Sequence, residues 1–119
     1  MKTRIAVIIA VLLSLVSMAA FAADDYDARR ARQYTREAEY YQRKAEGYRR
    51  EAAYFLRKAE GYQRDAAYYT RKGDADRAKD YCRKASSAMD DYKTQMRYAG
   101  KADDTAADYL RKAAAVLRK

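Results

Sequence analysis

The sequence contains no histidine, no tryptophan and no proline, and only one cysteine and four glycines among its 119 residues. Without histidine, the chain lacks the usual proton shuttle near neutral pH and the commonest side-chain ligand for transition metals. The single cysteine, Cys82, has no imidazole to activate it and no second thiol with which to form a disulfide inside the chain. We therefore expect neither an enzyme nor a protein that binds a metal or a cofactor.

Bulky aliphatic side chains are scarce after residue 23, and much of the apolar content is alanine and tyrosine. A compact core needs large apolar side chains to offset the entropy that the chain loses on folding. The absence of proline, with abundant alanine, arginine, lysine and glutamate, favours long helices instead. The sequence therefore predicts an all-α protein of long amphipathic helices.

The N-terminal segment differs from the rest of the chain. Lys2 and Arg4 precede an aliphatic run from Ile5 to Val16, and residues 20–22 (Ala-Phe-Ala) supply small residues for a cleavage site. This is the three-part layout of a secretory signal peptide, although residues 5–23 are also close to the lower length limit of a membrane anchor. We predict a signal peptide at residues 1–22 and a periplasmic or secreted helical domain at residues 23–119, with a net charge of about +7.

A 14-residue repeat occupies the first half of this domain, reading YYQRKAEGYRREAA from Tyr40 and YFLRKAEGYQRDAA from Tyr54. Fourteen residues are two heptads, so the repeat predicts a coiled coil. We name its apolar stripe the Ala/Tyr seam, in which alanine at position a alternates with an aromatic residue at position d. Position a holds Ala38, Ala45, Ala52, Ala59 and Ala66, and position d holds Tyr34, Tyr41, Tyr48, Phe55, Tyr62 and Tyr69.

The second half repeats every seven residues from Ala78 onward, but the two registers do not join. The first register would continue at Gly73, and an offset of five residues does not let one apolar stripe continue. Gly73 suits a left-handed helix C-cap, and Asp74 suits the N-cap of a following helix. We predict an antiparallel two-helix hairpin, with helices at about residues 25–72 and 75–118 and a turn at about 73–75. One continuous helix is the alternative.

Arginine fills heptad position f without a gap, and we call this set the Arg column: Arg36, Arg43, Arg50, Arg57, Arg64 and Arg71. One guanidinium about every 10 Å along a helix makes a linear cationic stripe. Such a stripe could bind lipid headgroups or other anionic polymers of a cell envelope. The alternative is that f is simply the most solvated heptad position, with its charge partly neutralised by nearby glutamates. Export leaves little opportunity for a nucleic acid partner, and we expect none.

Position c alternates tyrosine with glycine, from Tyr40 through Gly47, Tyr54 and Gly61 to Tyr68. A glycine inside a helix costs about 1 kcal/mol relative to alanine, so some gain should offset it. Our hypothesis is that each glycine makes room for a tyrosine ring from a partner helix.

Two interpretations remain open for Cys82. As an odd cysteine in an exported protein, it could form an intermolecular disulfide in a homo-oligomer. Alternatively, it is a small apolar residue in one column with Met89 and Met96.

Residues 107–119 read ADYLRKAAAVLRK, and the heptads before them carry alanine at intervals of seven residues. Together these features resemble the small alanine-zipper murein lipoproteins of bacterial outer membranes. The resemblance implies a long coiled coil with an alanine seam, whose terminal Lys119 is attached to peptidoglycan. The chain differs from that family in having no lipidated cysteine after the signal peptide, so we expect no lipid anchor.

These features favour an exported structural or scaffolding coiled-coil protein of the bacterial envelope, which self-associates through the Ala/Tyr seam and presents the Arg column to anionic surfaces. One alternative is a small cationic periplasmic chaperone that holds unfolded client proteins. A second alternative is a cationic helix that acts on membranes.

Overall fold

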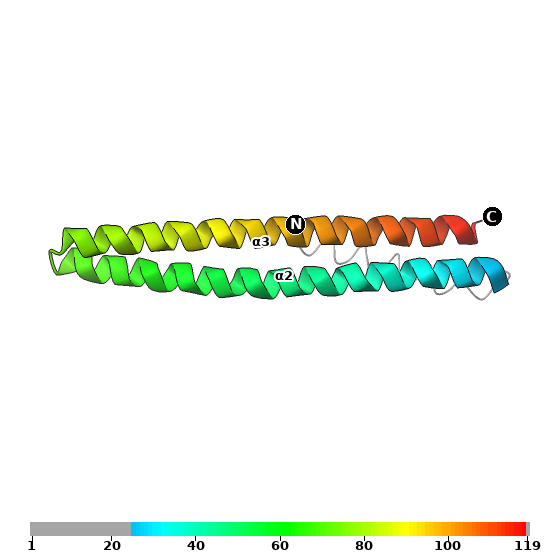
Figure 1. The fold of residues 1–119 in the computed structure, drawn as a ribbon, viewed down its shortest axis with the longest axis horizontal. Helices are drawn as coiled ribbons and strands as arrows, with labels where there is room; N and C mark the ends of the chain where they lie inside the picture. The colour runs from blue at the N-terminus through cyan, green and yellow to red at the C-terminus, as the bar shows by residue number, and fades with distance from the viewer. Residues whose placement is uncertain (1–24, 119) are drawn as a thin grey trace. The chain divides into compact units, whose positions relative to one another are not determined.

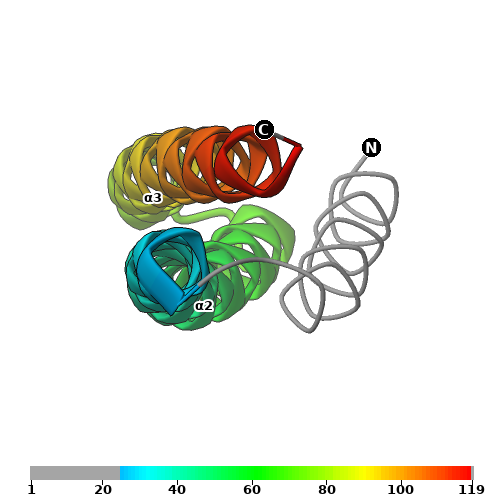
Figure 2. The same cartoon turned by 90° about the vertical axis from the view of Figure 1, so that its right-hand side faces the viewer.

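The computed structural model describes residues 25–118, so the predicted signal peptide and Lys119 lie outside the described residues. Two helices, α2 (Asp25–Arg71) and α3 (Ala75–Leu117), make up almost all of this range. Figure 1 shows that the chain reverses direction between them, so that α3 returns antiparallel beside α2, and Figure 2 shows the same pair end-on. The predicted all-α hairpin is confirmed, and the alternative of one continuous helix is wrong.

The reversal is made by the two capping residues that the sequence indicates. Gly73 has a φ of 76°, a left-handed conformation that glycine adopts without steric cost. The Gly73 N–H donates to the Thr70 carbonyl at 3.1 Å, and the Asp74 N–H donates to the Tyr69 carbonyl at 2.9 Å. This pair of hydrogen bonds is the Schellman motif of a helix C-terminus. Asp74 Oδ1 then accepts from the Arg77 N–H at 3.1 Å, which caps the first turn of α3.

Contacts within the chain divide it into two compact units, which are described separately below. The turn unit is Glu46–Ala99, and the terminal unit comprises residues 25–45 and 100–118 of the described range. Both helices run through both units without a break. In particular, α3 continues through Gly100, as its unbroken heptad register predicts.

In the turn unit, every buried side chain is an alanine. These residues are Ala52, Ala59, Ala66, Ala78, Ala85, Ala88 and Ala99. The volume that alanine leaves open is filled by aromatic rings from both helices. Tyr69 stacks on Tyr81 with ring centroids 5.5 Å apart, and Tyr48 lies 5.5 Å from Tyr98. Such ring pairs add about 0.5–1.5 kcal/mol beyond the area that they bury.

The terminal unit follows the same pattern but adds larger aliphatic side chains. Ala38, Ala106 and Leu110 form one buried cluster, against which Tyr41 and Tyr109 pack. The two tyrosine rings are stacked, with centroids 5.8 Å apart and an interplanar angle of 14°. The Ala/Tyr seam is therefore the surface on which α2 and α3 of one chain meet.

A buried acidic side chain also lies in the terminal unit. Asp103 is 4% exposed and is the charged residue that the core of the described range contains. It stands between Met96 and Leu110 in the seven-residue column of α3 that begins at Cys82. Its place in an otherwise apolar column is the sequence signal for this burial.

Candidate anionic-surface interface

The Arg column lies on α2, and all six of its side chains are exposed. The terminal unit carries Arg36 and Arg43, and the turn unit carries the other four. Seven helical residues rise about 10 Å, so neighbouring guanidinium groups of the turn unit follow one another at about that interval. The sequence therefore identified a set of solvated arginines at one heptad position.

The charge of this column is not neutralised by contact with carboxylates. Ion pairs near the turn and on α3 join Arg77 to Asp74 at 3.5 Å and Arg111 to Asp108 at 2.8 Å. Within residues 25–118, however, no ion pair joins any arginine of the column to a carboxylate. The neighbouring glutamates lower the local charge without occupying the guanidinium donors. The donors of all six side chains are therefore available to an external anion.

Two further arginines lie next to the column in the terminal unit. Arg29, Arg32 and Arg36 line one shallow hollow, together with Gln33 and Glu37. Residues three and four apart share one side of a helix, which brings these guanidinium groups together. Arg29 and Arg32 were not among the predicted site residues, although their three- and four-residue spacing toward Arg36 can be read in the sequence.

Arg30, one residue from this hollow, has a different environment. Its Nη2 donates to the Tyr34 hydroxyl at 3.5 Å, and its guanidinium lies 5.7 Å from the centre of the Tyr26 ring. The hydrogen bond to Tyr34 is the main cause that raises the pKa of Arg30 above its usual value. Arg30 is thus a permanent cation held against aromatic rings.

The tyrosines at position c are exposed, and each has a lysine over its ring. Tyr40, Tyr54 and Tyr68 keep 46–47% of their surface accessible. The lysine four residues later places its Nζ close to the ring centre in each case: Lys44 at 5.3 Å from Tyr40, Lys58 at 5.2 Å from Tyr54, and Lys72 at 5.6 Å from Tyr68. Distances below about 6 Å are those of cation–π contacts. The sequence signal for these pairs is the i, i+4 spacing of tyrosine and lysine.

The two glycines at position c have open space beside them. A Cβ added at Gly47 would meet nothing within 4 Å, and one at Gly61 would meet only the Arg64 Nη2 at 4.0 Å. The described residues therefore supply no ring to fill either gap. The hypothesis of a ring from a partner helix stays a prediction.

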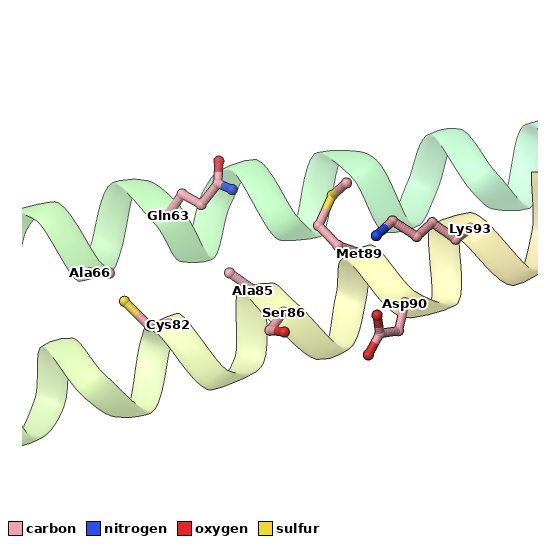
Figure 3. Close-up of a pocket in the computed structure, with 8 residues that line it drawn as sticks. All are labelled: Gln63, Ala66, Cys82, Ala85, Ser86, Met89, Asp90 and Lys93. Atoms are coloured by element: carbon pink, nitrogen blue, oxygen red, sulfur yellow. The ribbon is translucent and has the colours of Figure 1, made fainter.

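Cys82 is exposed, and the structure does not bury it as a small apolar core residue. It lines a hollow in the turn unit with Ala85 and Met89 of α3 and with Gln63 and Ala66 of α2. Figure 3 shows its side chain directed from α3 toward α2, near Ala66. Because Cys82 is exposed, it is not enclosed by the hairpin, and the intermolecular disulfide stays a prediction.

Residues 25–118 contain no cluster of three or more cysteine and carboxylate side chains that could hold a metal ion. Over the same range, no helix is long and apolar enough to cross a membrane. The fold and surface define a helical hairpin with a cationic face. No protein-family model matches the chain, and no curated protein or solved structure is significantly similar to it.

Proposed function

We propose that the protein is an exported structural component of the bacterial cell envelope, which binds anionic surfaces through the Arg column. The observation that carries this proposal is a set of six exposed arginines at a constant seven-residue interval, none paired with a carboxylate of the described chain. Export and envelope location rest on the signal-peptide pattern at residues 1–22.

The chemistry of arginine favours such a role. A guanidinium group presents a planar fork of donors that fits phosphate and carboxylate oxygens two at a time. A helix fixes the spacing of successive forks in advance, so less conformational entropy is lost when several of them bind one surface. The affinity of the whole face should therefore exceed that of any single contact.

Self-association belongs to the same proposal, but the Ala/Tyr seam is already used between α2 and α3 of one chain. Contacts between chains therefore need another surface. In the turn unit, Cys82 is exposed and Met89 and Met96 are only partly buried on one edge of α3. Flexible methionine side chains adapt well to such contacts. A disulfide dimer that is visible on a non-reducing gel and is lost in the Cys82→Ser variant would support this edge of α3 as the contact between chains.

A binding titration tests the main proposal. The purified protein should bind immobilised polyphosphate, and its affinity should fall steeply as salt rises, because each guanidinium contact releases a counterion. When several guanidinium groups bind together, the logarithm of the binding constant should fall steeply with the logarithm of the salt concentration. Failure to bind, or affinity that is insensitive to salt, would reject the Arg column as an anion-binding face.

A small cationic chaperone is the second candidate, favoured by the exposed aromatic side chains Tyr26, Tyr40, Tyr54, Tyr68 and Tyr98. Tyrosine and arginine make adaptable contacts at protein interfaces. A chaperone should suppress the aggregation of an unfolded client at stoichiometric ratios, whereas an envelope scaffold should not.

A membrane-active helix is less well supported, because the large apolar side chains exposed on the described chain are all tyrosines. Helices that insert into a membrane surface present leucine, phenylalanine or tryptophan to it. Leakage of anionic vesicles on addition of the protein would favour this third function.

A further inference from the structure

The same arrangement of side chains occurs three times along α2, centred on Tyr40, Tyr54 and Tyr68. In each copy an arginine lies four residues before the tyrosine, a second arginine three residues after it, and a lysine four residues after it. We call these copies the Tyr–Lys modules: residues 36–44 in the terminal unit, and residues 50–58 and 64–72 in the turn unit.

Each module holds its ring in a fixed orientation. The lysine lies over the ring, and the following residue packs against it at a steep angle. The ring centroids are 5.2 Å apart for Tyr40 and Tyr41, 5.4 Å for Tyr54 and Phe55, and 5.1 Å for Tyr68 and Tyr69. These contacts leave almost half of each tyrosine exposed. The rings are thus preorganised for an external ligand, which reduces the entropy lost on binding.

Each module also carries a surplus of positive charge. The two flanking arginines belong to the Arg column and are unpaired with any carboxylate of the described chain. Counting all charged residues, the net charge is +1 for residues 36–44 and +2 for residues 50–58 and 64–72. An oriented aromatic surface therefore lies between two free guanidinium groups in every copy.

From this geometry we infer that the Tyr–Lys modules bind an acidic polysaccharide. The apolar C–H face of a pyranose stacks on the exposed tyrosine ring, and the carboxylate or phosphate group of the sugar accepts hydrogen bonds from the flanking guanidinium groups. A purely ionic polymer would need no ring, and a neutral sugar would need no guanidinium group. The inference rests on the proposed function, because it specifies which anionic surface the Arg column meets.

Two other ligand classes fit the modules less well. A membrane surface would call for exposed aliphatic side chains, but the large apolar side chains exposed on the described residues are tyrosines. Single-stranded nucleic acid also combines stacking with phosphate contacts, but the predicted export separates the protein from it. A polymer fits better than a small molecule, because the two modules of the turn unit repeat every 14 residues, or roughly 21 Å of helix.

The test removes the rings while leaving every charge in place. The variant Tyr40→Ala/Tyr54→Ala/Tyr68→Ala is compared with the wild-type protein and with Tyr98→Ala, which removes an exposed tyrosine outside the modules. The probes are polygalacturonate, which has a carboxylate on every pyranose, and polyphosphate, which has charge but no sugar. The triple variant should bind polygalacturonate about tenfold or more weakly, a factor that corresponds to the loss of a few aromatic contacts. Its affinity for polyphosphate, and both affinities of Tyr98→Ala, should stay within about twofold of wild type.

A second variant distinguishes the contribution of the aromatic ring from that of the hydroxyl group, and a measurement of helix content distinguishes a loss of binding from a loss of fold. Tyr40→Phe/Tyr54→Phe/Tyr68→Phe should bind polygalacturonate like the wild-type protein, with circular dichroism confirming equal helix content in all variants. Equal affinity of the alanine variant and the wild type for polygalacturonate would overturn the inference and leave the proposed function standing. A larger loss of binding to a single-stranded oligonucleotide or to anionic vesicles would overturn it in favour of those ligands. If the wild-type protein bound none of the anionic probes, the proposed function itself would fail.

Discussion

The turn unit and the terminal unit use the same heptad spacing but different cores. In the turn unit every buried side chain is an alanine, and stacked tyrosines close the space between the helices. The terminal unit also buries Leu110 and Val116, together with the carboxylate of Asp103. Heptad spacing thus sets the hairpin in both units, while the size of the core residues determines what each unit tolerates. In the turn unit, replacing a buried alanine by a larger residue should be destabilising. In the terminal unit, truncating the buried leucine should be the most destabilising change.

The largest expected effect is in the terminal unit. Leu110 is fully buried, so Leu110→Ala should lower the free energy of unfolding by about 2–5 kcal/mol through lost burial and a residual cavity. The matched variant in the turn unit is Leu56→Ala, which truncates a leucine that is only half-buried. Chemical denaturation should show a clearly smaller loss for Leu56→Ala. Equal losses would contradict the difference between the two cores.

Enlarging a core alanine tests the turn unit in the opposite direction. Ala59 is fully buried where the helices meet, so Ala59→Leu should lower the free energy of unfolding by about 1–3 kcal/mol through overpacking. Ala53→Leu is the control, because Ala53 is exposed on the same helix. A neutral or stabilising Ala59→Leu, measured by thermal unfolding, would mean that the alanine seam is loosely packed.

Replacing one glycine in each unit by alanine should change the free energy of unfolding in opposite directions. Gly73→Ala places a Cβ on a residue with φ of 76°, so it should destabilise the hairpin by about 1 kcal/mol. Gly100→Ala should stabilise it by up to about 1 kcal/mol, because Gly100 is inside α3 and a Cβ there meets nothing within 4 Å. If the midpoint of urea unfolding moved in the same direction in both variants, the assigned capping role of Gly73 would be contradicted.

The substitutions of Gly47 and Gly61 should have an effect on stability per residue as small as that of Gly100→Ala, and they are the most informative about partners. Replacing both by alanine should raise the free energy of unfolding of the hairpin, by up to about 1 kcal/mol each, because no side chain of residues 25–118 fills either gap. If a ring from a partner helix uses these gaps, sedimentation should also show a smaller assembly than that of wild type. A more stable variant with unchanged assembly would reject the hypothesis of a partner ring, and Gly100→Ala provides the control.

Much of the hairpin could be predicted from the sequence because its determinants are local. The heptads define the buried face, and the five-residue offset with Gly73 and Asp74 defines the turn. Burial of Asp103 was missed, because a carboxylate is normally interpreted as solvated and only its column position indicates otherwise. The contacts of lysines with the tyrosine rings were also missed, although the i, i+4 spacing of tyrosine and lysine can be read in the sequence. The position of each lysine over its ring depends on side-chain conformation, and the exposure of Cys82, for which two interpretations were open, depends on how the two helices face each other. Composition and spacing determine neither.

The anionic-surface proposal requires that the Arg column, rather than net charge alone, holds the protein on its partner. One measurement tests this requirement: binding to immobilised polyphosphate by two variants of equal charge. In one variant all six arginines of the column become glutamine. In the other, six exposed basic residues outside the column become glutamine: Lys79, Arg83, Lys93, Lys101, Arg111 and Arg118. We expect the first variant to lose most of its affinity and the second to remain close to wild type, whereas equal losses in both variants would contradict the proposal.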